Sequence, residues 1–265
     1  MNLSGFKRKL HTILNDNTSG STDILISIAK LAKEYSFHKR CIREIIRTSE
    51  ITFRHFPVVI KYISILKPIL KSFSSGKIIT ETNKYLSSLS GKHSGIYYKN
   101  ISILKNLNCI VTISNSRTVA GLLRLMHQEN KKLEVIVCES RPAFEGRELI
   151  KELLADKITC KLITDASMPS FIEKCDGVIA GADQILSNND VVNKTGSRAA
   201  AICCKFFGKP FYVAATKDKK VRRKKFIPEE SDPSEVFDLK DKNLRVYNFC
   251  FERIEKKLIT KILTD

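Results

Sequence analysis

The sequence has no uninterrupted apolar run long enough to cross a lipid bilayer. Three basic residues near the start, Lys7, Arg8 and Lys9, are not followed by an apolar segment, so a secretory signal peptide is not indicated. The eight cysteines show no paired spacing typical of metal ligands, and several lie within apolar runs, as buried free thiols do. We therefore expect a cytoplasmic protein with no membrane association and no bound metal.

Acidic residues are scarce: 28 Asp and Glu face 46 Lys and Arg, which gives a formal net charge of +18. Such a charge favours attraction to RNA or another acidic partner, but it specifies no sequence or site. The densest cluster of positive charge is the run KDKKVRRKK at residues 217–225. This run is either a binding surface for an acidic macromolecule or an ordinary solvated loop.

The sequence also lacks internal repeats and the G-x-G-x-x-G pattern, so we predict no dinucleotide and no other cofactor. From Asn108 onward, short apolar segments rich in β-branched residues alternate with segments of helical periodicity. This alternation predicts a Rossmann-like parallel sheet with right-handed crossovers. The predicted strands cover residues 109–114, 133–138, 159–164, 177–180 and 211–215.

The region before Asn108 has a different pattern. Apolar residues recur at helical spacing between Thr22 and about Gly91, and Thr22 and Asp23 are suitable capping residues at the start. The loop-like segment 90–95 is rich in Ser and Gly and indicates a boundary. We therefore predict a helical N-terminal domain over residues 1–95 and a Rossmann-like α/β domain over residues 96–265.

The most informative stretch begins with the predicted strand 177–180, which ends just before Asp183. Asn193, Lys194 and Gly196 follow, directly before a predicted helix at 197–207. Because ligands of open parallel sheets bind at the carboxyl ends of strands, and a helix N-terminus attracts anions, this stretch suits a phosphate. The alternative is that Asp183 caps a helix and Lys194 is solvated surface.

The other strand ends add polar residues at the same predicted edge of the sheet. Ser114 and Arg117 follow the first strand, Arg141 follows the second, and Asp165 follows the third. Two arginines and a lysine at one edge suit a ligand that carries a phosphate, either a sugar or a nucleotide. An ordinary salt bridge to Glu139 or Glu145 is the alternative for Arg141.

Several motifs, in this order along the chain, resemble the translation initiation factor 2B alpha/beta/delta family, whose superfamily includes methylthioribose-1-phosphate and ribose-1,5-bisphosphate isomerases. The resemblance extends from about Cys109 to the end and implies a homodimer or a family hetero-oligomer. The matching segments are CESRP (138–142), EGREL (145–149), LITD (162–165), GADQIL (181–186), VVNKTGSRAAA (191–201) and PFYVAA (210–215).

The isomerases of this superfamily use a cysteine after the first strand and an aspartate in the GAD motif. The resemblance places Asp183 at the aspartate, but Ser114 stands at the cysteine. A thiol has a pKa of about 8.5, and the pKa of a serine hydroxyl is far higher. No histidine lies in this motif to act as a base for Ser114. A counterpart of the isomerases' Arg-Gly-Ala loop is also not recognisable before Cys109.

We therefore predict a non-catalytic, initiation factor 2B-like regulatory protein without appreciable isomerase activity. It would bind its ligand through Arg117, Arg141, Asn193 and Lys194. One alternative is an aldose–ketose isomerase that acts on ribose 1,5-bisphosphate or methylthioribose 1-phosphate through Asp183 and an unidentified partner. Another is a protein associated with RNA or the ribosome through its basic run, and a translation GTPase is a further candidate partner.

Overall fold

A computed structural model describes residues 3–265 and divides the chain into two compact units, one ending at Gly91 and one beginning at Lys92. Each unit is described separately below. In the described part of the chain, no helix is both long enough and apolar enough to cross a membrane.

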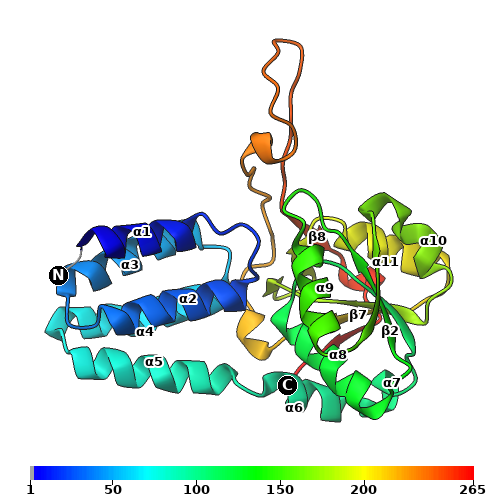
Figure 1. Ribbon diagram of the computed structural model, residues 1–265, viewed down its shortest axis with the longest axis horizontal. Helices are drawn as coiled ribbons and strands as arrows, with labels where there is room; N and C mark the ends of the chain where they lie inside the picture. Colours follow the sequence, from blue (N-terminus) through cyan, green and yellow to red (C-terminus); the bar gives the residue numbers. More distant parts are fainter. Residues whose placement is uncertain (1–2) are drawn as a thin grey trace. The chain divides into compact units, whose positions relative to one another are not determined.

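The N-terminal unit is helical, and apolar residues at helical spacing form its core (Figure 1). The first helix was not predicted from the sequence; it contributes Phe6 and Leu10, one turn apart and both buried. The fourth helix continues through Pro68 even though this residue removes one intrahelical hydrogen bond. Among residues 3–91 the helices are α1 (Leu3–Leu14), α2 (Ser21–Glu34), α3 (Lys39–Thr52), α4 (Pro57–Ser72) and α5 (Ser75–Leu89).

The second unit contains a six-stranded parallel sheet with the order β3-β2-β1-β4-β7-β9. Strands β2 and β3 are added in turn on one side of β1, and β4, β7 and β9 are added in turn on its other side. Between β1 and β4 the direction of building reverses, which is where such sheets bind ligands. The strands are β1 (Cys109–Thr112), β2 (Glu134–Cys138), β3 (Thr159–Ile163), β4 (Gly177–Ala180), β7 (Phe211–Ala214) and β9 (Lys261–Leu263).

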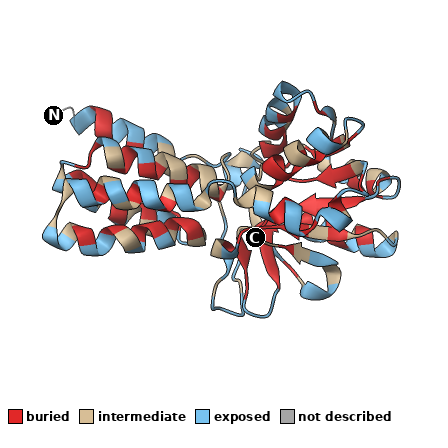
Figure 2. Ribbon diagram, turned by 90° about the horizontal axis from the view of Figure 1, so that it is seen from below, coloured by how far each residue is buried: buried red, intermediate tan, exposed pale blue. Residues whose placement is uncertain are grey.

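Alternate strand residues face opposite sides, so the sheet has an apolar core on each face. Val111 packs on the side of α10 and α11, whereas its neighbour Ile110 packs on the side of α8 and α9. Figure 2 shows most strands of this sheet as buried. The covering helices are α6 (Lys92–Lys99), α7 (Ile101–Leu104), α8 (Arg117–Glu129), α9 (Glu145–Ala155), α10 (Met168–Ile172) and α11 (Ser197–Phe206). The prediction of a helical N-terminal region followed by a Rossmann-like α/β domain is confirmed.

A second, antiparallel sheet was not predicted. It consists of β5 (Gln184–Ile185), β6 (Val191–Lys194) and β8 (Phe251–Ile254). Asn193 and Lys194, which the sequence placed directly before a helix, therefore belong to the central strand of this sheet and are buried.

Between β7 and β8 the chain extends away from the sheet as an irregular arm, which we define as residues 228–249 (Figure 1). The two limbs of the arm pair at their base through a bridge between Glu230 and Phe249 and through a Ser231 N–H bond to the Asn248 carbonyl. Short 3-10 turns complete the unit: η1 (Asp165–Ser167), η2 (Lys217–Lys219), η3 (Pro233–Glu235) and η4 (Lys256–Leu258).

Candidate functional site

The loops that follow β1 and β2 are joined by a hydrogen bond at the carboxyl edge of the sheet. Ser114 and Ser140 both adopt left-handed backbone conformations, with φ of 67° and 64°. The Ser114 N–H donates to Ser140 Oγ at 2.7 Å, and Ser140 Oγ donates to the Cys138 carbonyl at 3.0 Å. Left-handed φ is uncommon for residues other than glycine, so these contacts hold the two loops in conformations the chain disfavours. The result is a fixed position for the Ser114 side chain.

A buried carboxyl group connects Ser114 to Lys194. Ser114 Oγ donates to Glu145 Oε2 at 2.6 Å, and Lys194 Nζ donates to Glu145 Oε1 at 3.0 Å. The Lys194 side chain is 2% exposed and that of Glu145 is 11% exposed. Thus Ser114, which the sequence left without an acid–base partner, contacts a carboxyl group directly. Lys194 does not lie on the solvated surface. It forms a buried ion pair with Glu145, whether or not it also contacts a ligand.

Burial raises the pKa of Glu145 above its ordinary value, since removal from water penalises the charged form. The positive charge of Lys194 and the hydrogen bonds from Ser114 and Lys194 oppose this effect, whereas the negative charge of Asp183 adds to it. The net direction is upward because desolvation is the largest contribution. A carboxyl group of this kind can hold a proton at a pH where an exposed one cannot, which is what a general acid requires.

This raised pKa predicts a pH-dependent difference in stability between the wild type and Glu145→Gln. Above the ordinary pKa of 4.5, the unfolded chain ionises Glu145 while the folded protein resists ionisation. The wild type should therefore lose stability as the pH rises through the raised pKa, by about 1.4 kcal/mol for each pKa unit that separates the two states. Urea unfolding between pH 4 and pH 8 should show Glu145→Gln gaining stability relative to the wild type.

Glu148→Gln is the matched control, because Glu148 is exposed on the same helix. Its stability relative to the wild type should change little over this range. If the two variants gave equal pH profiles, the raised pKa of Glu145 would be wrong.

Asp183 lies just beyond β4, where its N–H donates to the Val192 carbonyl at 2.8 Å. Lys219 Nζ lies 3.7 Å from Asp183 Oδ1, and the two side chains are only 7% and 16% exposed. Asp183 therefore forms an ion pair and does not cap a helix. Lys219 belongs to the basic run 217–225, so part of that run is buried beside Asp183.

Gly181 allows the loop after β1 to approach β4 closely. A Cβ atom at Gly181 would lie 2.7 Å from both Cβ and Oγ of Ser116, which is too close. Ser116 caps α8, accepting a long hydrogen bond from Val119 N–H at 3.5 Å. The glycine thus lets Arg117, the first residue of α8, lie beside the end of β4.

The N-terminus of α11, which the sequence offered as a phosphate site, is already occupied by a carboxylate. Glu252 Oε1 in β8 accepts hydrogen bonds from the N–H groups of Gly196 at 2.7 Å and Arg198 at 2.8 Å. Asn193 Nδ2 donates to Ser197 Oγ at 2.9 Å. The predicted role of this helix end is therefore corrected, because pairing of β6 with β8 brings Glu252 to it.

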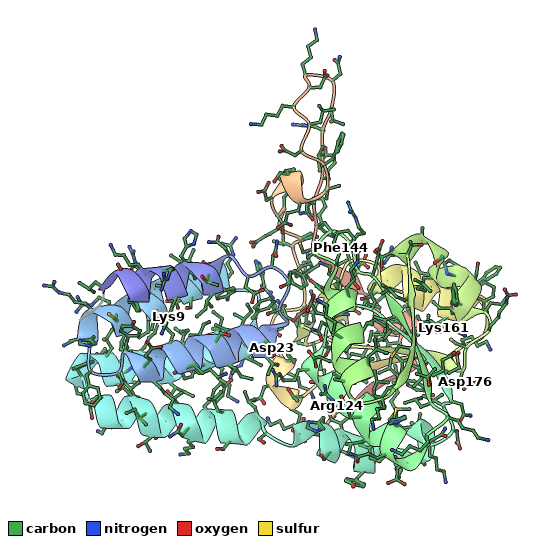
Figure 3. All side chains as sticks on the ribbon, in the orientation of Figure 1. Lys9, Asp23, Arg124, Phe144, Lys161 and Asp176 are labelled. Carbon is green, nitrogen blue, oxygen red and sulfur yellow. The ribbon has the colours of Figure 1, made fainter. Side chains whose placement is uncertain are left out.

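Arg141 forms neither of the salt bridges considered for it. Its N–H donates to Asp165 Oδ2 at 2.8 Å, and its guanidinium lies 4.9 Å from the centre of the Phe144 ring. Its Nη2 lies 3.4 Å from the Val236 carbonyl in the arm. Glu139 pairs with Arg147 at 3.0 Å instead. Figure 3 labels Phe144, which caps the start of α9.

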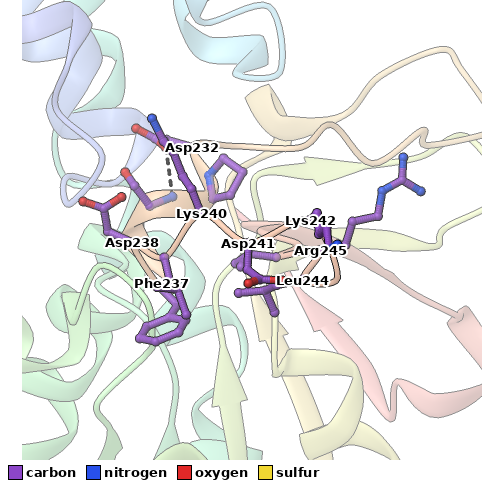
Figure 4. Close-up of a pocket in the computed structure, with 12 residues that line it drawn as sticks. Asp232, Phe237, Asp238, Lys240, Asp241, Lys242, Leu244 and Arg245 are labelled. Carbon is purple, nitrogen blue, oxygen red and sulfur yellow. Dashed lines mark hydrogen bonds between the residues drawn. The ribbon is translucent and has the colours of Figure 1, made fainter.

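A cavity of about 570 Å³ lies in the arm itself (Figure 4). Phe237 and Leu244 line it together with charged residues, including Asp238 and Arg245. Ser114, Glu145, Asp183 and Lys194 are not among its lining residues. This cavity is therefore separate from the acid–base groups at the sheet edge. Within residues 3–265, no group of three or more His, Cys, Asp or Glu side chains is placed to hold a metal ion.

A model of the initiation factor 2 subunit family matches residues 24–265. The chain belongs to this family. The predicted resemblance is thereby confirmed, and it extends further toward the N-terminus than the motifs indicated.

Among characterised sequences, the methylthioribose-1-phosphate isomerase of Heliobacterium modesticaldum is 38% identical over 161 residues, which are 56% of this chain and 46% of that protein. The enzyme of the same name from Desulfitobacterium hafniense is 36% identical over 203 residues, which are 71% and 58% of the two chains. The chain thus spans about half the length of the curated relatives it matches.

Solved structures share the fold. The translation initiation factor eIF-2B of Pyrococcus horikoshii matches with a TM-score of 0.81 at 23% identity. The match covers 97% of this chain and 94% of that protein's chain. The 5-methylthioribose 1-phosphate isomerase of the same organism has a TM-score of 0.78 at 21% identity, with 98% and 82% covered. A third neighbour belongs, by its description, to a tetrameric eIF2B complex.

These relatives contradict the prediction of a non-catalytic, initiation factor-like protein. The sequence relatives at 34–38% identity carry the name of an isomerase, whereas the initiation factor structures are similar at 23% identity or less. The prediction relied on Ser114 having no acid–base partner, and the contact between Ser114 and Glu145 removes that reason.

Proposed function

We propose that this protein is an aldose–ketose isomerase that acts on a ribose derivative phosphorylated at carbon 1, with methylthioribose 1-phosphate as the first substrate to test. The hydrogen-bonded chain from Ser114 through Glu145 to Lys194, close to Asp183, is the observation that carries this proposal. Kinship with the isomerases supports it.

The phosphate on carbon 1 prevents the sugar ring from opening by simple aldehyde formation, so the reaction needs both an acid and a base. An acid gives a proton to the ring oxygen as the bond between that oxygen and carbon 1 breaks. The hydrogen on carbon 2 then moves to carbon 1 with its electron pair, while a base takes the proton of the carbon 2 hydroxyl. The product is the open-chain ketose, with the same atoms as the substrate.

In this proposal Glu145 supplies the proton and Ser114 passes it to the ring oxygen. The distance of 2.6 Å between Ser114 Oγ and Glu145 Oε2 is suitable for proton transfer. Burial eases protonation of Glu145 by raising its pKa, although Lys194 opposes this; once Glu145 is protonated, the hydrogen bond with Ser114 reverses, so that Glu145 donates and Ser114 Oγ accepts. A serine next to a buried carboxyl group would thus replace the single thiol expected from the resemblance, and Lys194 would hold the carboxyl group in place.

Asp183 is the base in this proposal, and Arg117 and Arg141 remain the predicted phosphate-binding residues. A guanidinium group binds phosphate oxygens in a bidentate manner. Asn193 and Lys194, predicted to bind ligand directly, would instead support the site from β6, because Asn193 bonds Ser197 and Lys194 bonds Glu145.

The experiment is a turnover assay with purified protein and methylthioribose 1-phosphate, with formation of the ketose followed by NMR. We expect turnover by the wild type and a loss of roughly a hundred- to ten-thousand-fold in kcat for Glu145→Gln, since the amide holds no transferable proton. Glu148→Gln on the same helix should retain wild-type kcat. Ribose 1,5-bisphosphate is the second substrate, and absence of turnover with both would refute the proposal.

We also propose that the chain forms a homodimer or a family hetero-oligomer in the cytoplasm; the support is the description of one structural neighbour as a tetrameric eIF2B-beta2-delta2 complex. Binding of RNA or of a translation GTPase through the basic run stays a prediction. The exposed members of that run are Lys217, Lys220, Arg222, Arg223, Lys224 and Lys225.

A further inference from the structure

We propose that Lys219 is a positioning residue for the reaction and that its buried ammonium group holds the Asp183 carboxylate in the orientation that accepts the substrate proton. This inference rests on the proposed function. It assigns a chemical role to one residue of the basic run, which composition alone would place in a solvated loop or on a nucleic-acid surface.

The pair has the burial of an internal site. Lys219 Nζ lies 3.7 Å from Asp183 Oδ1, and the Lys219 side chain is 7% exposed, whereas the next residue, Lys220, is exposed. Burying an ammonium group is costly unless an opposite charge compensates it. Because the separation exceeds normal hydrogen-bond length, the pair acts chiefly through charge. The positive charge of Lys219 thus orients the Asp183 carboxylate, and Lys219 itself takes no part in proton transfer.

The turn that carries Lys219 is fastened on both sides. Within η2, the Lys219 N–H donates to the Thr216 carbonyl at 3.0 Å. The ammonium group of Lys92 pairs with Asp218, and the Lys217 N–H donates to Asp265 Oδ1 at 2.8 Å. These contacts come from the start and the end of the α/β unit, so they fix the turn independently of Asp183.

The following residues attach the same segment to the strand after Asp183. The Val221 N–H donates to the Ile185 carbonyl at 2.9 Å, and Arg223 Nη2 donates to Gln184 Oε1 at 2.6 Å. Both acceptors belong to β5, which begins one residue after Asp183. The segment that supplies the ammonium group and the segment that supplies the carboxylate are therefore held together by backbone and side-chain bonds.

Asp183 needs such a partner because a second carboxyl group is near. The charge of Asp183 contributes to the raised pKa of Glu145, so the two groups interact electrostatically. Two buried ammonium groups, Lys194 and Lys219, face these two carboxyl groups, one beside each. Without Lys219, the Asp183 carboxylate would be attracted toward Lys194 and would lose the fixed orientation that a base requires.

The test compares Lys219→Ala with Lys220→Ala, an exposed neighbour in the same run, using the full-length protein and methylthioribose 1-phosphate. We expect Lys219→Ala to lower kcat by about a hundredfold, the effect of misplacing a catalytic group by about 1 Å. KM should change by less than about threefold, because substrate contacts are kept. Added methylammonium should restore part of kcat in Lys219→Ala and change nothing in Lys220→Ala.

A second comparison uses Asp183→Asn as the background. If Lys219 acts through Asp183, Lys219→Ala should lower kcat no further in that background. A further fall there, or a kcat of Lys219→Ala equal to that of Lys220→Ala, would overturn the inference while leaving the proposed function intact. Absence of turnover in the wild type would instead overturn the proposed function, and this inference with it.

Circular dichroism and urea unfolding check that each variant folds. If Lys219→Ala does not fold, Lys219→Arg and Asp218→Asn take its place. Lys219→Arg keeps the charge and should retain kcat within about tenfold of the wild type. Asp218→Asn removes the ion pair with Lys92 and loosens the turn, but it leaves the groups of Lys219 and Asp183 unchanged. It should lower kcat and change KM less. Wild-type kcat in this variant would contradict the positioning role.

Discussion

Replacing Asp183 with asparagine is expected to lower kcat for the proposed isomerisation by roughly a hundred- to ten-thousand-fold. The amide has nearly the same shape as the carboxylate but cannot accept the proton of the carbon 2 hydroxyl. Asp183 follows β4 at the point where the sheet reverses its direction of building, and its partner Lys219 holds it in place. Initial rates over a range of substrate concentrations would separate kcat from KM.

The control for this substitution is Asp238→Asn, an exposed aspartate of the arm. It should leave kcat unchanged. Because Asp183→Asn also leaves Lys219 without its carboxylate, urea unfolding must accompany the kinetics. A folded Asp183→Asn protein with wild-type kcat would exclude Asp183 as the base, whatever the activity of other variants.

The fold could be predicted because the sequence pattern is local. Strands such as β1 and β2 are short apolar segments bounded by polar residues, and helices such as α8 and α9 carry apolar residues at helical spacing. Alternation of the two kinds of segment implies a parallel sheet with few topological alternatives. Helix α1 was missed; its fully buried residues are Gly5, Phe6 and Leu10, and Ile13 and Leu14 pack against the same core while partly exposed.

The pairing of β6 with β8 in the small antiparallel sheet could not be predicted, because it joins distant residues. Lys194 in β6 pairs with Phe251 in β8, and the arm separates these strands along the chain. The sequence near Lys194 resembles the approach to a helix, so no strand was predicted there. Pairing with β8 also brings Glu252 to the start of α11, and the anion site expected there is occupied as a result.

The acid–base partner of Ser114 was missed for a related reason. Glu145 was considered only as a salt-bridge partner of Arg141, because the two are close in sequence. Its actual contacts, Ser114 and Lys194, are 31 and 49 residues away along the chain. Sequence reasoning identified the edge of the sheet where the polar residues meet, but the choice of partners depends on the left-handed turns at Ser114 and Ser140.

Net charge was likewise a poor guide to the basic run 217–225. Lys219 is buried beside Asp183, and Arg223 bonds Gln184, so two basic side chains of the run have specific partners within the α/β unit. A dense run of positive charge predicts a strong local field, but not whether a given ammonium group faces solvent or a carboxylate.

Gly146→Ala is expected to destabilise the protein by about 3 kcal/mol or more, at the upper end of what overpacking costs. A Cβ atom at Gly146 would lie 1.9 Å from the Cys138 carbonyl oxygen and 2.9 Å from its carbon, distances that no side chain can occupy. The obstacle is backbone at the end of β2, so it cannot turn aside as a flexible side chain would. Urea unfolding would measure the loss.

Gly76→Ala is a closely matched control, because Gly76 and Gly146 are each the second residue of a helix. Nothing lies within 4 Å of a Cβ atom at Gly76, so this substitution should be neutral or stabilise by up to about 1 kcal/mol through the helix preference of alanine. The difference between the two variants isolates the contact with β2. That contact places the start of α9, and with it Glu145, beside Ser114. A folded Gly146→Ala protein should therefore also lose turnover, and equal stability of the two variants would show that the end of β2 can move away from α9.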